Sequence, residues 1–201
     1  SEFSAASFSS LATATVSDST LSVANLNGAI AQANTATGAT STVFSLSAGA
    51  TINTGAESAF TTLLGYESAS QVSITDQNIT VDSGTISVDN ANLLDATTTG
   101  TVTASITTTE TVDEVTTLTA GSNAYTIVIA GGDATGSTAA EFNTINAATS
   151  VAIDASAVTG LASDTASNIK TLLTAGNDTD QFTANSFSQL ATVVVSDTTL
   201  D

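Results

Sequence analysis

Residues 7–21 read SFSSLATATVSDSTL, and residues 186–200 read SFSQLATVVVSDTTL. The two stretches match at 11 of 15 positions, and their numbering differs by 186 − 7 = 179. Self-similarity at a fixed spacing is typical of tandem repeat proteins. We therefore expect residues 4–185 to form one repeat domain of a longer array, and residues 186–201 to begin the next copy. Residues 1–3 are expected to be a cloning remnant.

A shorter period lies inside this long repeat. Helical signals, with apolar residues about three apart, alternate with β runs whose apolar residues are two apart. The helical signals lie at Phe8–Leu11, Leu26–Ile30, Phe60–Leu63, Leu93–Leu94, Val115–Leu118, Phe142–Ile145, Asn168–Leu173 and Phe187–Leu190. The predicted strand centres fall near residues 16, 44, 73, 103, 128, 152 and 194. The pattern predicts strand–helix units of about 25–30 residues, the length range of known repeat units.

Units this short cannot bury an apolar face alone, so successive units must stack. The sequence therefore predicts an α/β solenoid in which the stacked strand–helix units form one parallel sheet. A globular βαβ domain would also alternate strands with helices. A second alternative is an all-β parallel solenoid in which the helical signals are merely turns.

Capping signals support the predicted helices. Ser22 precedes the segment that contains Leu26, and serine commonly caps helix N-termini. Thr111 is followed three residues later by Glu114, and Thr138 by Glu141. This spacing is typical of the capping box, in which each side chain bonds the other residue's backbone N–H.

The charge balance excludes one class of partner. The chain holds nineteen Asp and Glu against a single Lys or Arg, for a net charge of −18. Phosphate backbones and anionic membrane surfaces are repelled by such a chain, so we expect no nucleic-acid binding. No apolar stretch approaches the length of about 18 residues that spans a bilayer, so no membrane insertion is expected. The acid excess itself indicates either solubility or divalent-cation binding.

The sequence contains few of the residue types that enzymes use in catalysis. The sequence contains no His, Cys or Arg, which removes Ser–His and Cys–His nucleophile pairs and the usual oxyanion clamp. A carboxylate-pair glycosidase needs only Asp and Glu. The only two tyrosines, Tyr66 and Tyr125, and the absence of Trp offer few platforms for a sugar. We therefore expect that the protein is not an enzyme and needs no organic cofactor.

Calcium is the one cofactor that the residues suggest. Asp133 lies in the glycine-bearing stretch 131–136, while Asp178 and Asp180 follow Gly176. Turns supply carbonyl oxygens beside carboxylates, and Ca²⁺ binds several oxygens at once. Alternatively, these aspartates bond the backbone of their own turns. A second set follows β runs and could align along one edge of the stack: Asp18, Asp76, Asp154 and Asp197.

The composition is rich in Ala, Thr, Ser and Asp and contains no Cys. Residues 151–160, VAIDASAVTG, are a typical stretch. This vocabulary resembles the repeat regions of very large bacterial surface proteins. These are the adhesin-like and S-layer-like proteins exported by type I secretion, including giant cyanobacterial and marine ones. The resemblance implies an extracellular location and a passive extender or lattice-forming wall. Members often carry calcium-binding glycine-rich repeats.

The sequence thus predicts a structural repeat segment of a large extracellular surface protein. The alternative is a calcium- or glycan-binding module on an acidic face. The expected partners are neighbouring repeats of the same chain. End-to-end self-association is also expected, because a cut array leaves unpaired strand edges.

Overall fold

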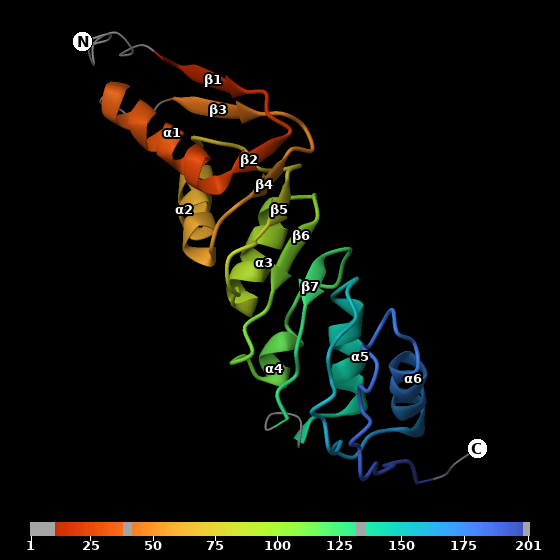
Figure 1. Cartoon of the computed structure of the whole chain (residues 1–201). Coiled ribbons are helices and arrows are strands. Elements are labelled where there is room, and N and C mark those ends of the chain that lie inside the picture. The colour runs from red at the N-terminus through yellow and green to blue at the C-terminus, as the bar shows by residue number, and fades with distance from the viewer. Residues whose placement is uncertain (1–10, 38–41, 132–135, 199–201) are drawn as a thin grey trace. The chain divides into compact units, whose positions relative to one another are not determined.

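The computed structural model describes residues 11–37, 42–131 and 136–198 (Figure 1). The fold is α/β, with short strands and helices alternating along the chain. The elements are β1 (Thr13–Val16), β2 (Thr20–Ser22), α1 (Val23–Thr37), β3 (Val43–Leu46), β4 (Thr51–Asn53), α2 (Glu57–Ser68), β5 (Asn78–Thr80), α3 (Val88–Thr97), β6 (Val102–Ser105), α4 (Val112–Val115), β7 (Ala124–Thr126), α5 (Ala139–Ala147) and α6 (Ala166–Gly176). None of the helices in the described residues is long and apolar enough to cross a membrane.

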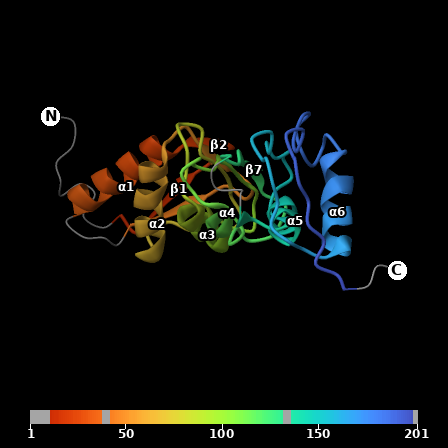
Figure 2. The ribbon, with the colours of Figure 1, turned by 90° about the horizontal axis from the view of Figure 1, so that it is seen from below.

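The chain divides into two compact units. Unit 1 comprises Ser1–Thr85 and Leu93–Thr103, and unit 2 comprises Ile86–Asn92 and Ala104–Asp201. In unit 1, α1 and α2 lie side by side, and in unit 2 the same holds for α5 and α6 (Figures 1 and 2). Strands with a defined register are parallel, as predicted, but they belong to two sheets rather than to the one sheet that was expected.

Unit 1 holds two open groups of strands. β1 pairs with β3, and β2 is followed in its sheet by β4, β5 and β6. Partners lie one strand–helix unit apart in the sequence, and we call each such unit a coil. The register pairs are Thr13 with Val43, Thr20 with Thr51, Thr51 with Asn78 and Ile79 with Val102. Their residue numbers differ by 43 − 13 = 30, 51 − 20 = 31, 78 − 51 = 27 and 102 − 79 = 23, close to the predicted period.

In unit 2 the parallel pairing continues mainly through single bridges. They join Ile86 to Ile106, Val128 to Asp154, Ile153 to Phe182, Gly160 to Thr192 and Asp164 to Val195. The differences in residue number run from 106 − 86 = 20 to 192 − 160 = 32. Each coil of unit 2 is therefore paired with the following coil, as in unit 1.

The predicted caps are present. The Thr111 hydroxyl accepts the Glu114 N–H at 3.2 Å, and the Glu114 carboxylate accepts the Thr111 N–H at 2.7 Å. Thr138 and Glu141 form the same capping box at the start of α5. Satisfying these backbone donors fixes where each helix begins. Ser22 is the residue before α1, and its hydroxyl lies 3.5 Å from the Asn25 nitrogen.

Apolar side chains of strands and helices meet in the core, and Phe60 and Phe142, which begin two of the predicted helical signals, are both fully buried. In unit 2, the Phe187 ring lies against Phe142 at 5.5 Å between centroids and against Phe182 at 5.0 Å. The Phe142–Phe187 pair is edge-to-face, a geometry that stabilises beyond simple burial. Phe8, which begins the first predicted helical signal, lies outside the described residues.

Two local predictions are wrong. Residues 187–189 form turns rather than the start of a helix, and Phe187 has a φ of 59°, which no α-helix allows. Several predicted strands are also shorter than expected. Near residues 73, 128, 152 and 194 the chain makes isolated bridges, while β2, β4 and β5 were not predicted. A typical coil therefore carries two short β segments in place of one.

Candidate functional site

The predicted calcium turn at Asp178 and Asp180 is closed by its own hydrogen bonds. The Asp178 Oδ1 accepts the Asp180 N–H at 3.0 Å, and its Oδ2 accepts the Gln181 side-chain amide at 2.8 Å. The hydrogen bond from Gln181, followed by that from Asp180, lowers the pKa of Asp178. The Asp180 side chain is exposed. Asp133, the third predicted ligand, lies outside the described residues.

The second carboxylate set, which was predicted to align along one edge of the stack, bonds separate groups. Within residues 11–37, 42–131 and 136–198, no group of three His, Cys, Asp or Glu is placed to hold a metal ion. Asp154 accepts the Ser156 N–H at 3.0 Å, so it closes its own turn as the alternative reading predicted. Asp76 accepts the Gln77 side-chain amide. Asp197 instead bonds a distant backbone group, the Ala166 N–H, at 2.7 Å.

The Asp197 contact belongs to a recurring arrangement that sequence reasoning missed. Four carboxylates accept backbone N–H groups at or just before the start of the helix in the preceding coil. Asp82 accepts Thr54 and Gly55 at 2.9 Å each before α2, Glu110 accepts Val88 at 3.2 Å in α3, Asp164 accepts Ala140 at 2.8 Å in α5, and Asp197 accepts Ala166 at 2.7 Å in α6. Helix N-termini carry unpaired donors and a partial positive charge, so an anion there is stabilising. Part of the acid excess therefore joins one coil to the next.

Asp164 has the most hydrogen bonds of these four carboxylates. Its Oδ1 accepts the Thr165 N–H at 2.7 Å and the Asn168 side-chain amide at 2.8 Å, besides the Ala140 bond to Oδ2. The residue is only 9 % exposed. Burial raises the pKa of Asp164, but the hydrogen bonds from Asn168, Thr165 and Ala140 together lower it below its ordinary value. The ionised form is therefore the one that the fold stabilises.

Asparagines make a second set of links between coils. Each follows a buried apolar residue on α1, α3 or α5 and donates its side-chain amide to a backbone carbonyl of, or just after, the next helix. Asn27 donates to Ala59 at 2.8 Å, Asn92 to Thr117 at 2.9 Å and Asn143 to Asn168 at 3.1 Å. The dipeptides Leu26-Asn27, Ala91-Asn92 and Phe142-Asn143 were the available sequence signal. In α2, α4 and α6 the residue that follows the buried apolar side chain at the equivalent place is Thr or Lys instead of Asn.

The turns after the helices follow the same alternation. After α1, α3 and α5 a threonine hydroxyl donates to the backbone carbonyl of the preceding coil: Thr42 to Leu11, Thr98 to Gln77 and Thr149 to Tyr125, at 2.8, 2.6 and 2.7 Å. After α2 and α6 the equivalent place holds a glutamine that pairs with an asparagine of the preceding helix. Gln71 donates to Asn34 at 2.6 Å, and Gln181 accepts from Asn146 at 2.7 Å. The local repeat is therefore a pair of coils.

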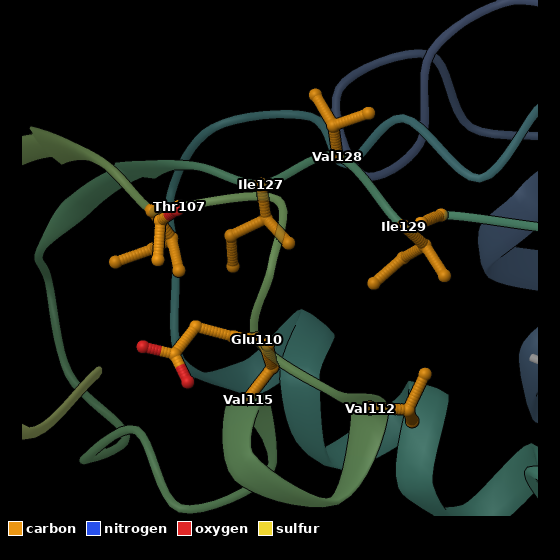
Figure 3. A pocket seen from close by; sticks show the side chains of 9 residues that line it. Thr107, Glu110, Val112, Val115, Ile127, Val128 and Ile129 are labelled. Carbon is orange, nitrogen blue, oxygen red and sulfur yellow. The ribbon is translucent and has the colours of Figure 1, made fainter. Parts of the chain in front are cut away.

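At this polar network, a hollow of about 420 Å³ that is open to solvent is lined by residues that include Asn143, Asn146 and Gln181. A small hollow in unit 2 has a volume of about 10 Å³, which is at most the room for one water molecule. Figure 3 shows Ile127 and Ile129 pointing toward the α4 residues Val112 and Val115, while Val128 points to the other side. This is the alternation of an extended segment whose inner face is core. The small hollow is thus a packing gap rather than a binding pocket.

No known protein family, no curated protein and no solved structure matches the chain. The function must therefore be argued from the links between coils. These links consist of carboxylates, amides and hydroxyls that are already bonded to backbone groups. Chemically, they hold successive coils together and leave few polar groups aimed at a common point.

Proposed function

We propose that this chain is a structural repeat segment, a spacer without catalysis, of a large extracellular bacterial surface protein. Its coils stack as an α/β solenoid, in which the strands of successive coils pair in parallel along the stack. The observation that carries this proposal is the constant pairing of each coil with the next, at nearly regular intervals along the sequence. Nearest-neighbour pairing of similar units is how solenoids gain their stability.

The polar side chains support the same role. Glu110 and Asp164 accept N–H groups in the first turn of a helix of the preceding coil, and Asp82 accepts N–H groups just before one. Asn27 and Asn143 tie a helix to the following one. A spacer must resist extension, and each link joins coils that are distant in sequence and adjacent in space. The recurrence of residues 7–21 at 186–200 supports an array, and the net charge of −18 favours solubility at a cell exterior.

Small-angle X-ray scattering of one copy and of two tandem copies, joined in the register of the recurrence, tests the proposal. A compact 201-residue domain has a radius of gyration of about 16–17 Å. We expect a larger value for one copy and a nearly doubled maximum dimension for two copies. A two-copy chain whose maximum dimension barely grows would overturn the spacer role. Antibodies against the chain should also label intact cells of the source organism.

A further inference from the structure

The repeated segment is held in a definite place at the end of unit 2. Thr192 pairs with Gly160 and Val195 with Asp164 in parallel bridges. The Ala191 N–H donates to the Thr159 carbonyl at 3.0 Å, and the Ser196 N–H donates to the Asp164 carbonyl at 2.8 Å. The structure thus shows what the copy at 191–197 binds: the strip of residues 159–166, which ends at the start of α6. We call residues 159–166 the docking strip.

The Asp197 carboxylate completes this contact. It accepts the N–H of Ala166, the first residue of α6, at 2.7 Å. In the register of the recurrence, Asp197 corresponds to Asp18, Thr192 to Thr13 and Val195 to Val16. The groups that contact the docking strip at these positions therefore have counterparts near the other end of the chain.

The first copy lacks the corresponding partner. β1 is an edge strand, since its two-stranded sheet contains only β3. Among the described residues, no hydrogen bond to the Asp18 carboxylate is present. A hollow of about 370 Å³ opens beside it in unit 1 and is lined by Val16, Asp18, Thr20, Leu21, Ser22, Asn25, Leu26 and Ala29. An unpaired strand edge beside an open, partly apolar hollow is suited to receive another strand.

We propose that residues 12–18 of one copy bind the docking strip of a second copy, in the place that residues 191–197 hold within a single chain. Parallel backbone pairing supplies the affinity, and the Asp18 carboxylate on the N-terminus of α6 sets the register. The inference rests on the proposed repeat role and specifies the junction between repeats. Because the two surfaces differ, copies join head to tail and the assembly is open-ended.

Within the intact chain, residues 191–197 compete for the docking strip. A tethered segment has an effective concentration on the order of millimolar, so the unaltered chain should remain mostly monomeric at micromolar concentrations. Proline has no backbone N–H. The double substitution Ala191→Pro and Ser196→Pro therefore removes the two N–H groups with which residues 191–197 bind the docking strip. The same pair of substitutions at Ala12 and Ser17 removes the corresponding donors of the incoming copy.

Sedimentation equilibrium of these full-length chains is the first test. The A191P/S196P chain should at least double its weight-average mass as its concentration rises, while the chain with all four prolines stays monomeric. Circular dichroism identifies a variant that has lost its fold. A folded A191P/S196P chain that remains monomeric, or a four-proline chain that associates equally well, would overturn the proposal.

A peptide of residues 7–21 gives a second test that avoids proline. Asp197→Asn weakens the internal contact only at the α6 cap, so the labelled peptide should bind this chain more tightly than the unaltered one. Carrying Asp18→Ala in the peptide should weaken binding about fivefold, the equivalent of one helix cap. Equal binding by both peptides, or none by either, contradicts the proposed register. A failure here leaves the scattering test of the spacer role unaffected, so the two proposals fail separately.

Discussion

The carboxylate of Asp164 accepts the backbone N–H of Ala140 at 2.8 Å, although 24 residues separate them. The same carboxylate also accepts bonds from Thr165 and Asn168, at the start of the next helix. Its own backbone pairs with residues 194 and 196. One buried acid therefore connects α5, α6 and the segment that follows α6.

Replacing this acid should cost stability. Asp164→Asn keeps the size of the side chain but removes the charge and one acceptor, so at least one N–H of Ala140, Thr165 or Asn168 loses its partner. We expect the free energy of unfolding to fall by about 1–3 kcal/mol, the range for hydrogen bonds to a charged group. Urea denaturation measures the change. Asp180→Asn, at an exposed carboxylate, is the matched control and should stay within about 0.5 kcal/mol.

The effect of Asp164→Asn should also depend on pH. Because the folded-state pKa of Asp164 lies below its ordinary value, its contribution is present above the unfolded pKa of about 3.9 and is lost as the pH falls through the folded pKa. The difference in unfolding free energy between the two chains should be constant down to about pH 5 and then shrink toward pH 2. A difference that grows on acidification contradicts this reading of the site.

Two glycines provide a paired test of how closely the coils pack. A methyl group at Gly100 would overlap the backbone of Gln77 and Asn78, whereas one at Gly28, inside α1, would meet nothing within 4 Å. Gly100→Ala should therefore destabilise unit 1 by more than about 1 kcal/mol, as backbone strain does. Gly28→Ala should stabilise it by about 0.5–1 kcal/mol through helix propensity. Thermal unfolding of both variants decides whether coil contact is as tight as the structure indicates.

Calcium should have little effect on stability. Both carboxylate oxygens of Asp178 already accept hydrogen bonds, so a cation there would have to displace Asp180 and Gln181. We expect melting temperatures in millimolar calcium and in chelator to agree within about 2 °C, since without binding to the folded state there is no linkage. A large rise with calcium, abolished by Asp178→Asn, would instead favour the calcium-binding alternative.

The helices could be predicted because their signals are local. The apolar pairs at Leu26–Ile30 and Phe142–Ile145 lie in α1 and α5, and the capping boxes occupy positions three residues apart. The ends of the strands were harder to predict, because each strand pairs with a segment of the next coil. The local alternation of apolar residues does not show where that pairing stops. β5, at Asn78–Thr80, was missed because polar Asp76 and Gln77 interrupt the apolar run before it.

Phe187 illustrates a different kind of error. Its spacing to Leu190 suits a helix, but its ring packs against Phe142 and Phe182 while its backbone is left-handed. Packing against residues from other parts of unit 2 accompanies this local conformation, and the spacing alone could not show it. The links between coils escaped prediction for the same reason: the acceptor role of Asp82 or Asp164 depends on which helix start lies beside it. Of these links, only the asparagine links could have been noticed in the sequence, from the dipeptides Leu26-Asn27, Ala91-Asn92 and Phe142-Asn143.

The carboxylate caps also impose a direction on how the molecule is completed. Four acids accept N–H groups at or just before the starts of α2, α3, α5 and α6, and they lie 28, 22, 24 and 31 residues downstream of Thr54, Val88, Ala140 and Ala166. During synthesis or export from the N-terminal end, each of these helices would emerge before its cap and be finished only when the next coil arrived. Each helix would therefore gain its carboxylate acceptor only after one more coil had emerged. In the proposed array, Asp197 would supply this acceptor from the following repeat. The last helix of each repeat would then be completed by the first aspartate of the next repeat.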